Sequence, residues 1–265
     1  MNFQKIIVTG GTKGIGRALI NQFLQKNCEI HVIARNFKNQ PESDNLFFHP
    51  IDLSQSEKVT AFGDNFLKTY GVPDLLINNA GSGAFYEWAS FPEEEIYKQC
   101  NLLFLSPVLL SRKFVPAMAK EERGTVLNVS SLATIYPLPF MPMYNSFKTS
   151  LSSYTRSMML EYEKVPCFID LILGDVCTDF NNNVHKQSNR QWNSRMKKAW
   201  EQIQKQLLMS PNADVISRRI IKIILQNESG VYYEGSILHR LFFPKIERFI
   251  SFKLKKFFLQ RRYFY

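Results

Sequence analysis

The stretch KIIVTGGTKGIGRALINQFLQK, residues 5–26, decides the fold. Its first five residues are mostly apolar and β-branched, which predicts a buried strand, and residues 17–26 repeat apolar side chains at helical spacing. A glycine-rich turn joins the two segments. A strand, a tight turn and a helix in this order form the first part of a β–α–β unit, which predicts a parallel sheet.

Strand-like and helix-like segments alternate along the rest of the chain. Residues 56–70 also have helical periodicity, and no long linker or internal repeat interrupts the pattern. We therefore predict one α/β domain over residues 1–235, a doubly wound, mostly parallel sheet with helices on both faces. Further strands are expected at Glu29–Ala34, Leu46–Pro50, Asp74–Asn78, Thr125–Ser130, Phe168–Leu173 and about Val231–Glu234.

Composition narrows the class of protein. The chain has 265 residues, of which 45% are hydrophobic, enough for a core and too many for intrinsic disorder. No stretch approaches the roughly 18 uninterrupted apolar residues of a membrane-spanning helix. The four cysteines and four histidines are scattered without metal-ligand spacing. We therefore expect free thiols, no metal site and a cytoplasmic location.

The glycine-rich turn carries the first functional signal. Gly10, Gly14 and Gly16 stand between the first strand and the first helix. They would allow a tight turn, close approach of the backbone to a pyrophosphate and close packing of helix on strand. The N-terminus of the helix would supply unpaired N–H groups for phosphates. This placement predicts a dinucleotide site.

Two later segments point to the same edge of the sheet. Asn78-Asn79-Ala80-Gly81 ends a strand with small residues that leave room for a flat cofactor. Tyr144 and Lys148 stand at i and i+4 on one helix face, where the ammonium would lower the pKa of the phenol. Ser131 follows another strand, thirteen positions before Tyr144, and would point its hydroxyl into the same crevice.

Taken together, these motifs resemble those of the short-chain dehydrogenase/reductase family over residues 3–235. The resemblance implies a Rossmann fold and the roles of four catalytic residues. Tyr144 would donate a proton to a substrate carbonyl, Lys148 would bind the nicotinamide ribose and lower the tyrosine pKa, and Ser131, rather than Ser130, would hold the carbonyl oxygen. Asn101 would position a relay water. The implied cofactor-binding residues are Gly10, Thr12, Lys13, Gly14, Ile15, Gly16, Arg35, Asp52, Leu53, Asn79, Ala80, Gly81, Tyr144, Lys148, Val176 and Thr178.

Two details refine this expectation. The second strand is followed by Arg35 and no carboxylate, and Lys13 lies in the glycine loop, so we predict NADP(H). The alternative is that both cations are ordinary surface charges. Where the family has Pro-Gly after the sixth strand, this chain has Leu173-Gly174, which removes a fixed φ and leaves the turn less constrained.

The substrate side is apolar. Residues 132–143 are nearly all apolar and proline-rich, and residues 180–209, which contain Trp192, Met196 and Trp200, resemble the family's variable lid. An apolar loop beneath this lid predicts a hydrophobic substrate, such as a 3-oxoacyl thioester, a lipid ketone or a steroid- or polyketide-like ketone. The alternative is that these side chains pack in the core or against another subunit.

The end of the chain is basic and aromatic. The whole chain has a formal net charge of +10. Residues 236–265 hold eight Lys or Arg and one acid, Glu247. Apolar residues recur at helical spacing from residue 246 onward, which predicts an amphipathic C-terminal helix. It could lie on an anionic membrane through residues 244–265, contact a neighbouring subunit, close the substrate entrance or remain a solvated face.

These observations predict an NADPH-dependent oxidoreductase that reduces a carbonyl of a hydrophobic substrate to an alcohol. Family habit implies a homodimer or homotetramer through the helices around residues 101–118 and 144–161. The alternative is a dinucleotide-binding scaffold or sensor without catalysis, although a pure binder has no need for Tyr144. Nucleic-acid binding is not expected, because the basic segment contains no base-reading module.

Overall fold

The computed structural model describes residues 3–37, 43–188, 192–241 and 249–265. Seven parallel strands form one sheet in the order β3-β2-β1-β4-β6-β7-β9. The doubly wound α/β fold is therefore confirmed, and each strand lies within one residue of its expected position. The strands are β1 (Lys5–Thr9), β2 (Glu29–Ala34), β3 (Leu46–Pro50), β4 (Leu75–Asn78), β6 (Thr125–Val129), β7 (Cys167–Leu173) and β9 (Gly230–Glu234).

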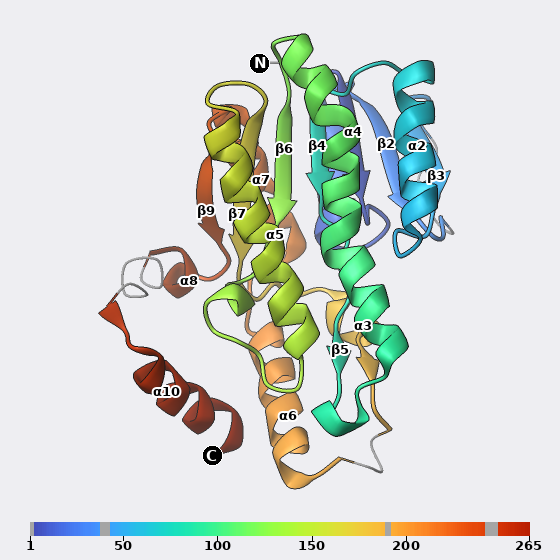
Figure 1. Cartoon of the computed structure of the whole chain (residues 1–265). Coiled ribbons are helices and arrows are strands. Elements are labelled where there is room, and N and C mark those ends of the chain that lie inside the picture. The colour runs from blue at the N-terminus through green and yellow to red at the C-terminus, as the bar shows by residue number, and fades with distance from the viewer. Residues whose placement is uncertain (1–2, 38–42, 189–191, 242–248) are drawn as a thin grey trace.

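Helices cover both faces of this sheet (Figure 1). On one face, α1 (Gly14–Leu24) and α7 (Ala213–Gln226) pack together over the strands. On the other face lie α2 (Ser56–Thr69), α4 (Ser106–Lys120) and α5 (Pro142–Glu161). Because both faces are buried, the central strands are almost continuously apolar, as expected for a parallel sheet.

A long helical run precedes the sixth strand of the chain. The helix α3 (Glu93–Cys100), a π-helical turn (Asn101–Leu105) and α4 join without a break. By length and composition this run could cross a membrane, although 44% of its most apolar window is buried in the protein. Its side chains Leu110, Phe114 and Met118 are fully buried against the sheet, so it serves here as a core helix.

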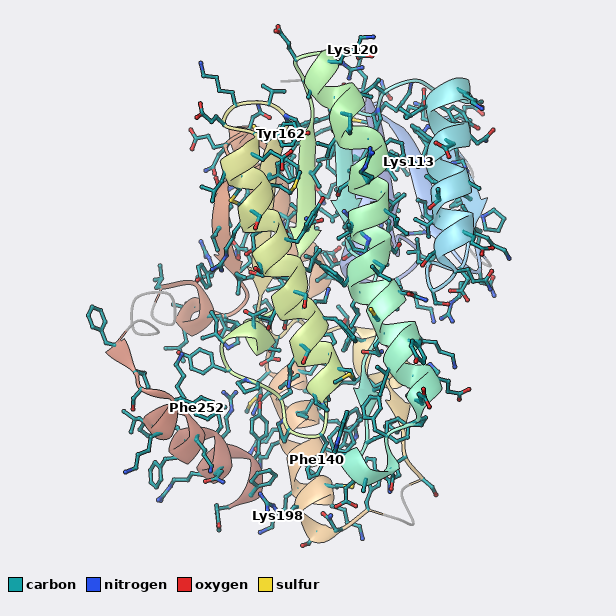
Figure 2. The ribbon with its side chains drawn as sticks, in the orientation of Figure 1. Lys113, Lys120, Phe140, Tyr162, Lys198 and Phe252 are labelled. Carbon is teal, nitrogen blue, oxygen red and sulfur yellow. The ribbon has the colours of Figure 1, made fainter. Side chains whose placement is uncertain are left out.

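The carboxyl ends of the strands face a third group of elements (Figure 1). A short sheet pairs β5 (Ala84–Phe85) with β8 (His185–Lys186). The same group includes α6 (Ser194–Leu208), α10 (Phe252–Phe264), which packs on α6, and α8 (Ile237–Leu241), which contacts β9. Figure 2 shows the side chains of this lower group filling the space between α6 and the loop that carries Phe140.

The C-terminal segment is helical where the structure describes it. Ser251 caps α10 by accepting the backbone N–H of Leu254, and α10 packs against α6. The predicted helix began at Ile246, and residues 242–248 lie outside the described part of the chain. The apolar side chains of α10 occupy both its inner and its outer sides, so the prediction of a helix is confirmed and the prediction that it is amphipathic is wrong.

Candidate active site

One large cavity opens at the carboxyl ends of the strands. Its volume is about 1130 Å³, and its lining includes Lys13 and Arg35 from the N-terminal part of the chain and Tyr263 from α10. Of the residues expected at the site, all but Gly16 and Asn101 line this cavity. The motifs, separated by more than 160 positions along the chain, therefore meet at one site.

The glycine loop is held to the end of β4 by hydrogen bonds. The carboxamide of Asn79 donates to the carbonyl oxygens of Thr9 and Gly10 at 3.0 and 3.1 Å. The hydroxyl of Thr9 accepts the N–H groups of Asn79 and Ala80, both at 3.0 Å. Asn79 thus lines the cavity and also fixes the loop, a second role that its position in the motif did not predict.

Gly16 does not line the cavity but packs against two residues that do, Gly10 and Asn79. A Cβ at this position would collide with the carbonyl oxygen of Gly10 and lie 2.7 Å from the carboxamide of Asn79. The helix α1 can approach the loop because residue 16 has no side chain. Gly14, at φ +53°, lies under the side chain of Thr178, 3.3 Å from a hypothetical Cβ.

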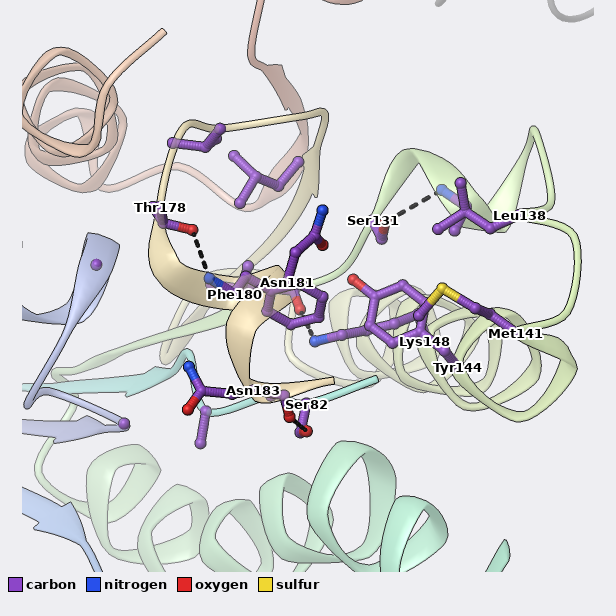
Figure 3. Close-up of a pocket in the computed structure, with 18 of the residues that line it drawn as sticks. Ser82, Ser131, Leu138, Met141, Tyr144, Lys148, Thr178, Phe180, Asn181 and Asn183 are labelled. Atoms are coloured by element: carbon purple, nitrogen blue, oxygen red, sulfur yellow. Dashed lines mark hydrogen bonds between the residues drawn. The ribbon is translucent and has the colours of Figure 1, made fainter. Parts of the chain in front are cut away.

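Ser131, Tyr144 and Lys148 lie together in the wall of the cavity (Figure 3). Ser131 follows β6 and accepts the N–H of Ala133 at 3.1 Å, which fixes its hydroxyl in the cavity. Tyr144 and Lys148 come from the first turns of α5. Figure 3 shows the phenol of Tyr144 directed toward Ser131.

Ser130 points elsewhere. Its hydroxyl donates to the fully buried carboxylate of Asp170, which also accepts from Ser152 at 2.6 Å and from Arg156 at 3.1 Å. The choice of Ser131 over Ser130 agrees with this geometry.

The expected effect of Lys148 on Tyr144 is wrong for this structure. Burial raises the pKa of the Tyr144 phenol, the hydrogen bond with Ser131 partly opposes this rise, and Asp175 adds to it. The ammonium of Lys148 donates to the carbonyl oxygen of Val129 at 2.6 Å. The spacing brought the two residues to one site, but burial outweighs a charge that is directed at the backbone.

Lys148 itself is strongly perturbed. Burial lowers its pKa to about 8, against a smaller opposite effect from the negative charge of Asp170. An amine with this pKa changes protonation state close to neutral pH. Lys148 is thus able to take up or release a proton under ordinary conditions.

Asn101 is not brought together with these three residues. Its carboxamide donates to the carbonyl oxygen of Ser54 at 2.8 Å, and it lies outside the described residues that line the cavity. It occupies the π-helical turn, where its own carbonyl accepts the N–H of Ser106. The water-positioning role implied by the family resemblance stays a prediction.

The turn after β7 is well defined without the family's proline. The N–H of Gly174 donates to the carbonyl oxygen of Glu234 at 2.8 Å, so β7 and β9 remain paired to the last residue. Beyond it, Val176 is buried and Thr178 accepts the N–H of Phe180 at 3.3 Å. A strand hydrogen bond thus holds the turn that lacks the fixed φ of proline.

The other half of the cavity has apolar side chains, with polar and charged ones such as Gln206, His239 and Arg262 among them. The loop after β6 contributes Leu138 and Met141, which confirms that residues 132–143 flank the pocket. The predicted lid differs in detail. Met196 and Trp200 are buried and Trp192 packs beside them in a core cluster with Phe85, so the alternative that these residues pack in the core is the correct one. From α6, the cavity is lined instead by Ile203, Gln206 and Leu207.

Sequence reasoning did not assign the residues that α8 and α10 bring to this half. Tyr263 is buried, and Leu259 lines the cavity next to it. His239 packs so closely on the turn after β7 that a Cβ on Gly174 would collide with its ring. Closure of the substrate entrance is one of the roles that the sequence permits for the tail, and helical spacing alone does not select it.

The chain matches known proteins over most of this architecture. The short chain dehydrogenase family model matches residues 4–189. An uncharacterized oxidoreductase of Bacillus subtilis, YvrD, is 31% identical over 58% of this chain and 60% of its own length, so the match spans less than two thirds of that relative. The 3-ketodihydrosphingosine reductase of Bacteroides thetaiotaomicron is 26% identical over 69% of this chain and 68% of its own length.

Solved structures show the same fold. An alcohol dehydrogenase from the archaeon Thermococcus sibiricus, in complex with 5-hydroxy-NADP, superposes with a TM-score of 0.71 at 19% identity, covering 90% of this chain and 99% of that one. Other similar structures are complexes with NADH. Proteins of this fold therefore bind either NADP(H) or NAD(H).

Proposed function

The chain belongs to the short-chain dehydrogenase/reductase family of oxidoreductases, and on that basis we propose that it is an NADPH-dependent reductase of a carbonyl group in a hydrophobic substrate. The observation that carries the proposal is the single cavity in which a glycine loop, a Ser–Tyr–Lys set and an apolar wall meet. A nicotinamide dinucleotide, when bound there, would supply hydride to the carbonyl carbon.

The residues of the chain fit that cofactor. The glycine loop and the Ala80-Gly81 turn leave open backbone along the wall of the cavity, where a Cβ on Gly81 would lie 3.8 Å from the ammonium of Lys148. Asp52 also faces the cavity, and its carboxylate is fixed by the N–H and hydroxyl of Ser54 at 2.9 and 2.8 Å. Asp52 and Leu53 would contact the adenine.

Tyr144 would act as the proton donor. Because burial raises the pKa of its phenol, the group stays protonated at neutral pH, which is the form that a donor needs. Ser131 would donate a hydrogen bond to the same carbonyl oxygen and stabilise the negative charge that develops there. Lys148, with a pKa of about 8, would return a proton to the phenol after each turnover.

The preference for NADPH rests on two cations at the adenine end. Lys13 and Arg35 both line the cavity there, and a guanidinium binds phosphate oxygens in a bidentate manner. Arg35→Ser should weaken NADPH binding by about tenfold or more and leave NADH binding nearly unchanged. Titration of protein fluorescence with both cofactors tests this. Equal affinities of the native protein for NADH and NADPH would refute the assignment.

The hydrophobic substrate is supported by the apolar side chains of the distal half, such as Leu138, Leu259 and Phe258. The name of the Bacteroides relative states the reduction of 3-ketodihydrosphingosine, which favours a lipid ketone among the classes considered. We further propose a cytoplasmic homodimer or homotetramer that associates through α4 and α5, with sedimentation velocity as its test.

The deciding experiment is NADPH consumption with a panel of ketones of increasing chain length. We expect turnover that improves with chain length. A protein that binds NADPH tightly but consumes it with none of these ketones would instead be the non-catalytic scaffold or sensor.

A further inference from the structure

The helix α10 has two different apolar sides. On its inner side, Leu259 and Tyr263 pack against α6 and line the cavity, and Tyr263 is only 4% exposed. On its outer side, Phe257 is 56% exposed and Leu254 45%, and Phe252, at the start of the helix, is 68% exposed. Figure 2 shows Phe252 at the start of this helix, at the margin of the molecule. An ordinary surface helix buries one apolar side and presents a polar one to water.

The charge of α10 has a single sign. Phe252–Phe264 contains five cations and no acid. The cations on its outer side include Lys253 and Arg261, both exposed. Just before the helix, Phe249 is 88% exposed. Exposed aromatic rings and Lys or Arg side chains are the residue types that bind an anionic membrane interface, and in α10 they share one surface instead of lying on separate faces.

The same helix borders the cavity at the point where it reaches the surface. Phe258 lines the cavity and is 56% exposed, and Lys255 lines the cavity while its ammonium lies 5.4 Å from the ring centre of Tyr136. A surface on which α10 rested would therefore adjoin the opening of the substrate half.

We propose that α10 docks the protein on an anionic lipid bilayer and that a membrane-resident long-chain ketone passes from the bilayer along Phe258 into the cavity. This inference rests on the proposed reductase activity for its substrate, and on the exposed side of α10 alone for its partner. Positive charge complements the anionic head groups, and the exposed rings are buried at the boundary of head groups and acyl chains.

The test for docking is co-sedimentation with vesicles of phosphatidylcholine, with and without phosphatidylglycerol. We expect binding only to vesicles that contain phosphatidylglycerol, and release at high salt. The double variant Lys253→Glu/Arg261→Glu should weaken binding by about 25-fold or more, from about fivefold for each cation lost. Phe252→Ser/Phe257→Ser should weaken it by about tenfold or more.

A matched control carries the same change of charge on the opposite side of the molecule. Lys58→Glu/Lys68→Glu places two acids on the exposed side of α2, far from α10 (Figure 1). It should bind vesicles almost as the native protein does. Equal loss in the two charge variants would indicate only a general effect of net charge and would overturn docking through α10.

The outcomes separate docking from catalysis. Lack of binding to anionic vesicles, with intact reduction of a short water-soluble ketone, refutes docking and leaves the proposed function standing. Vesicle binding without NADPH consumption refutes the proposed function and the substrate route. Concentration-dependent association without lipid that Phe252→Ser/Phe257→Ser abolishes would show that a second copy, rather than a bilayer, covers this side.

For the substrate route, the measured quantity is reduction of a long-chain ketone embedded in anionic vesicles. The Lys253→Glu/Arg261→Glu variant should lose at least about tenfold of this rate, while its rate with a short soluble ketone stays unchanged. A parallel fall in both rates would show that the variant damages the active site instead, which would refute the route.

Discussion

The two halves of the cavity are built in different ways. In the cofactor half, backbone groups make the geometry: Asn79 donates to carbonyl oxygens of the glycine loop, and Thr9 accepts two N–H groups. These residues come from two neighbouring strands and the turns that follow them. In the substrate half, side chains from the loop after β6, from η4 (Asp179–Asn183), from α6 and from α10 pack into one cluster. The first half is set by strand order, and the second by packing between segments far apart in sequence.

The strongest test lies where the two halves meet. Replacing Tyr144 by Phe removes the proposed proton donor and keeps the aromatic ring, whose centre lies 5.9 Å from the ring centre of Phe180. The turnover number should fall by about 10²- to 10⁴-fold, while the dissociation constant for NADPH stays the same. Stopped-flow absorbance and fluorescence titration measure the two quantities.

The control for this variant is Tyr97→Phe, which removes the hydroxyl of an exposed tyrosine on α3. It should retain full activity. If the Tyr144→Phe protein turned over at the native rate, Tyr144 would not be the proton donor.

Lys148 belongs to the cofactor half, and burial of its ammonium lowers the stability of the folded protein. Its pKa is about 8 in the folded protein and near 10.5 when unfolded, so between these values the unfolded chain binds more protons. The contribution of Lys148 to the unfolding free energy should therefore rise with pH across this window, by up to about 3 kcal/mol. Below pH 8, burial of the charged ammonium opposes folding to its full extent.

The measurement is urea unfolding of the native protein and Lys148→Met at several pH values. The stability of the native protein relative to the variant should increase from pH 8 to 10.5. Lys222→Met, on the exposed side of α7, should show no such change. A native-minus-variant difference that is constant with pH would contradict the burial argument.

Sequence reasoning succeeded in the cofactor half because its determinants are local. Gly14, Gly16 and Asn79 stand at fixed offsets from strand ends, and the sheet order then brings them together. Sequence reasoning failed where a side chain could reach more than one partner or pack at more than one place. The ammonium of Lys148 reaches a backbone carbonyl instead of the phenol, and Trp200 fills the core instead of lining the cavity. The position of α10 depends on contacts with α6 that no local pattern encodes.

A pair of glycines tests the backbone origin of the cofactor half. Gly16→Ala places a methyl group against the Gly10 carbonyl and the Asn79 carboxamide, and should cost about 1–3 kcal/mol of stability and weaken NADPH binding. Gly81→Ala meets only ordinary contacts, at 3.5 Å from Leu103 and 3.8 Å from Lys148. Thermal unfolding should show a clear loss for the first variant and a small one for the second.

The smallest expected effect lies in the substrate half. Leu259→Ser removes apolar surface from the wall that α10 contributes, and should raise KM for a long-chain ketone by about tenfold. The dissociation constant for NADPH should not change, because the cofactor half is held by its own hydrogen bonds. Leu208→Ser, at a side chain 77% exposed on α6, is the matched control and should leave both quantities unchanged. Because KM and cofactor affinity are measured on the same protein, a parallel change in both would show that the two halves are coupled, and the division of the cavity into independent parts would have to be abandoned.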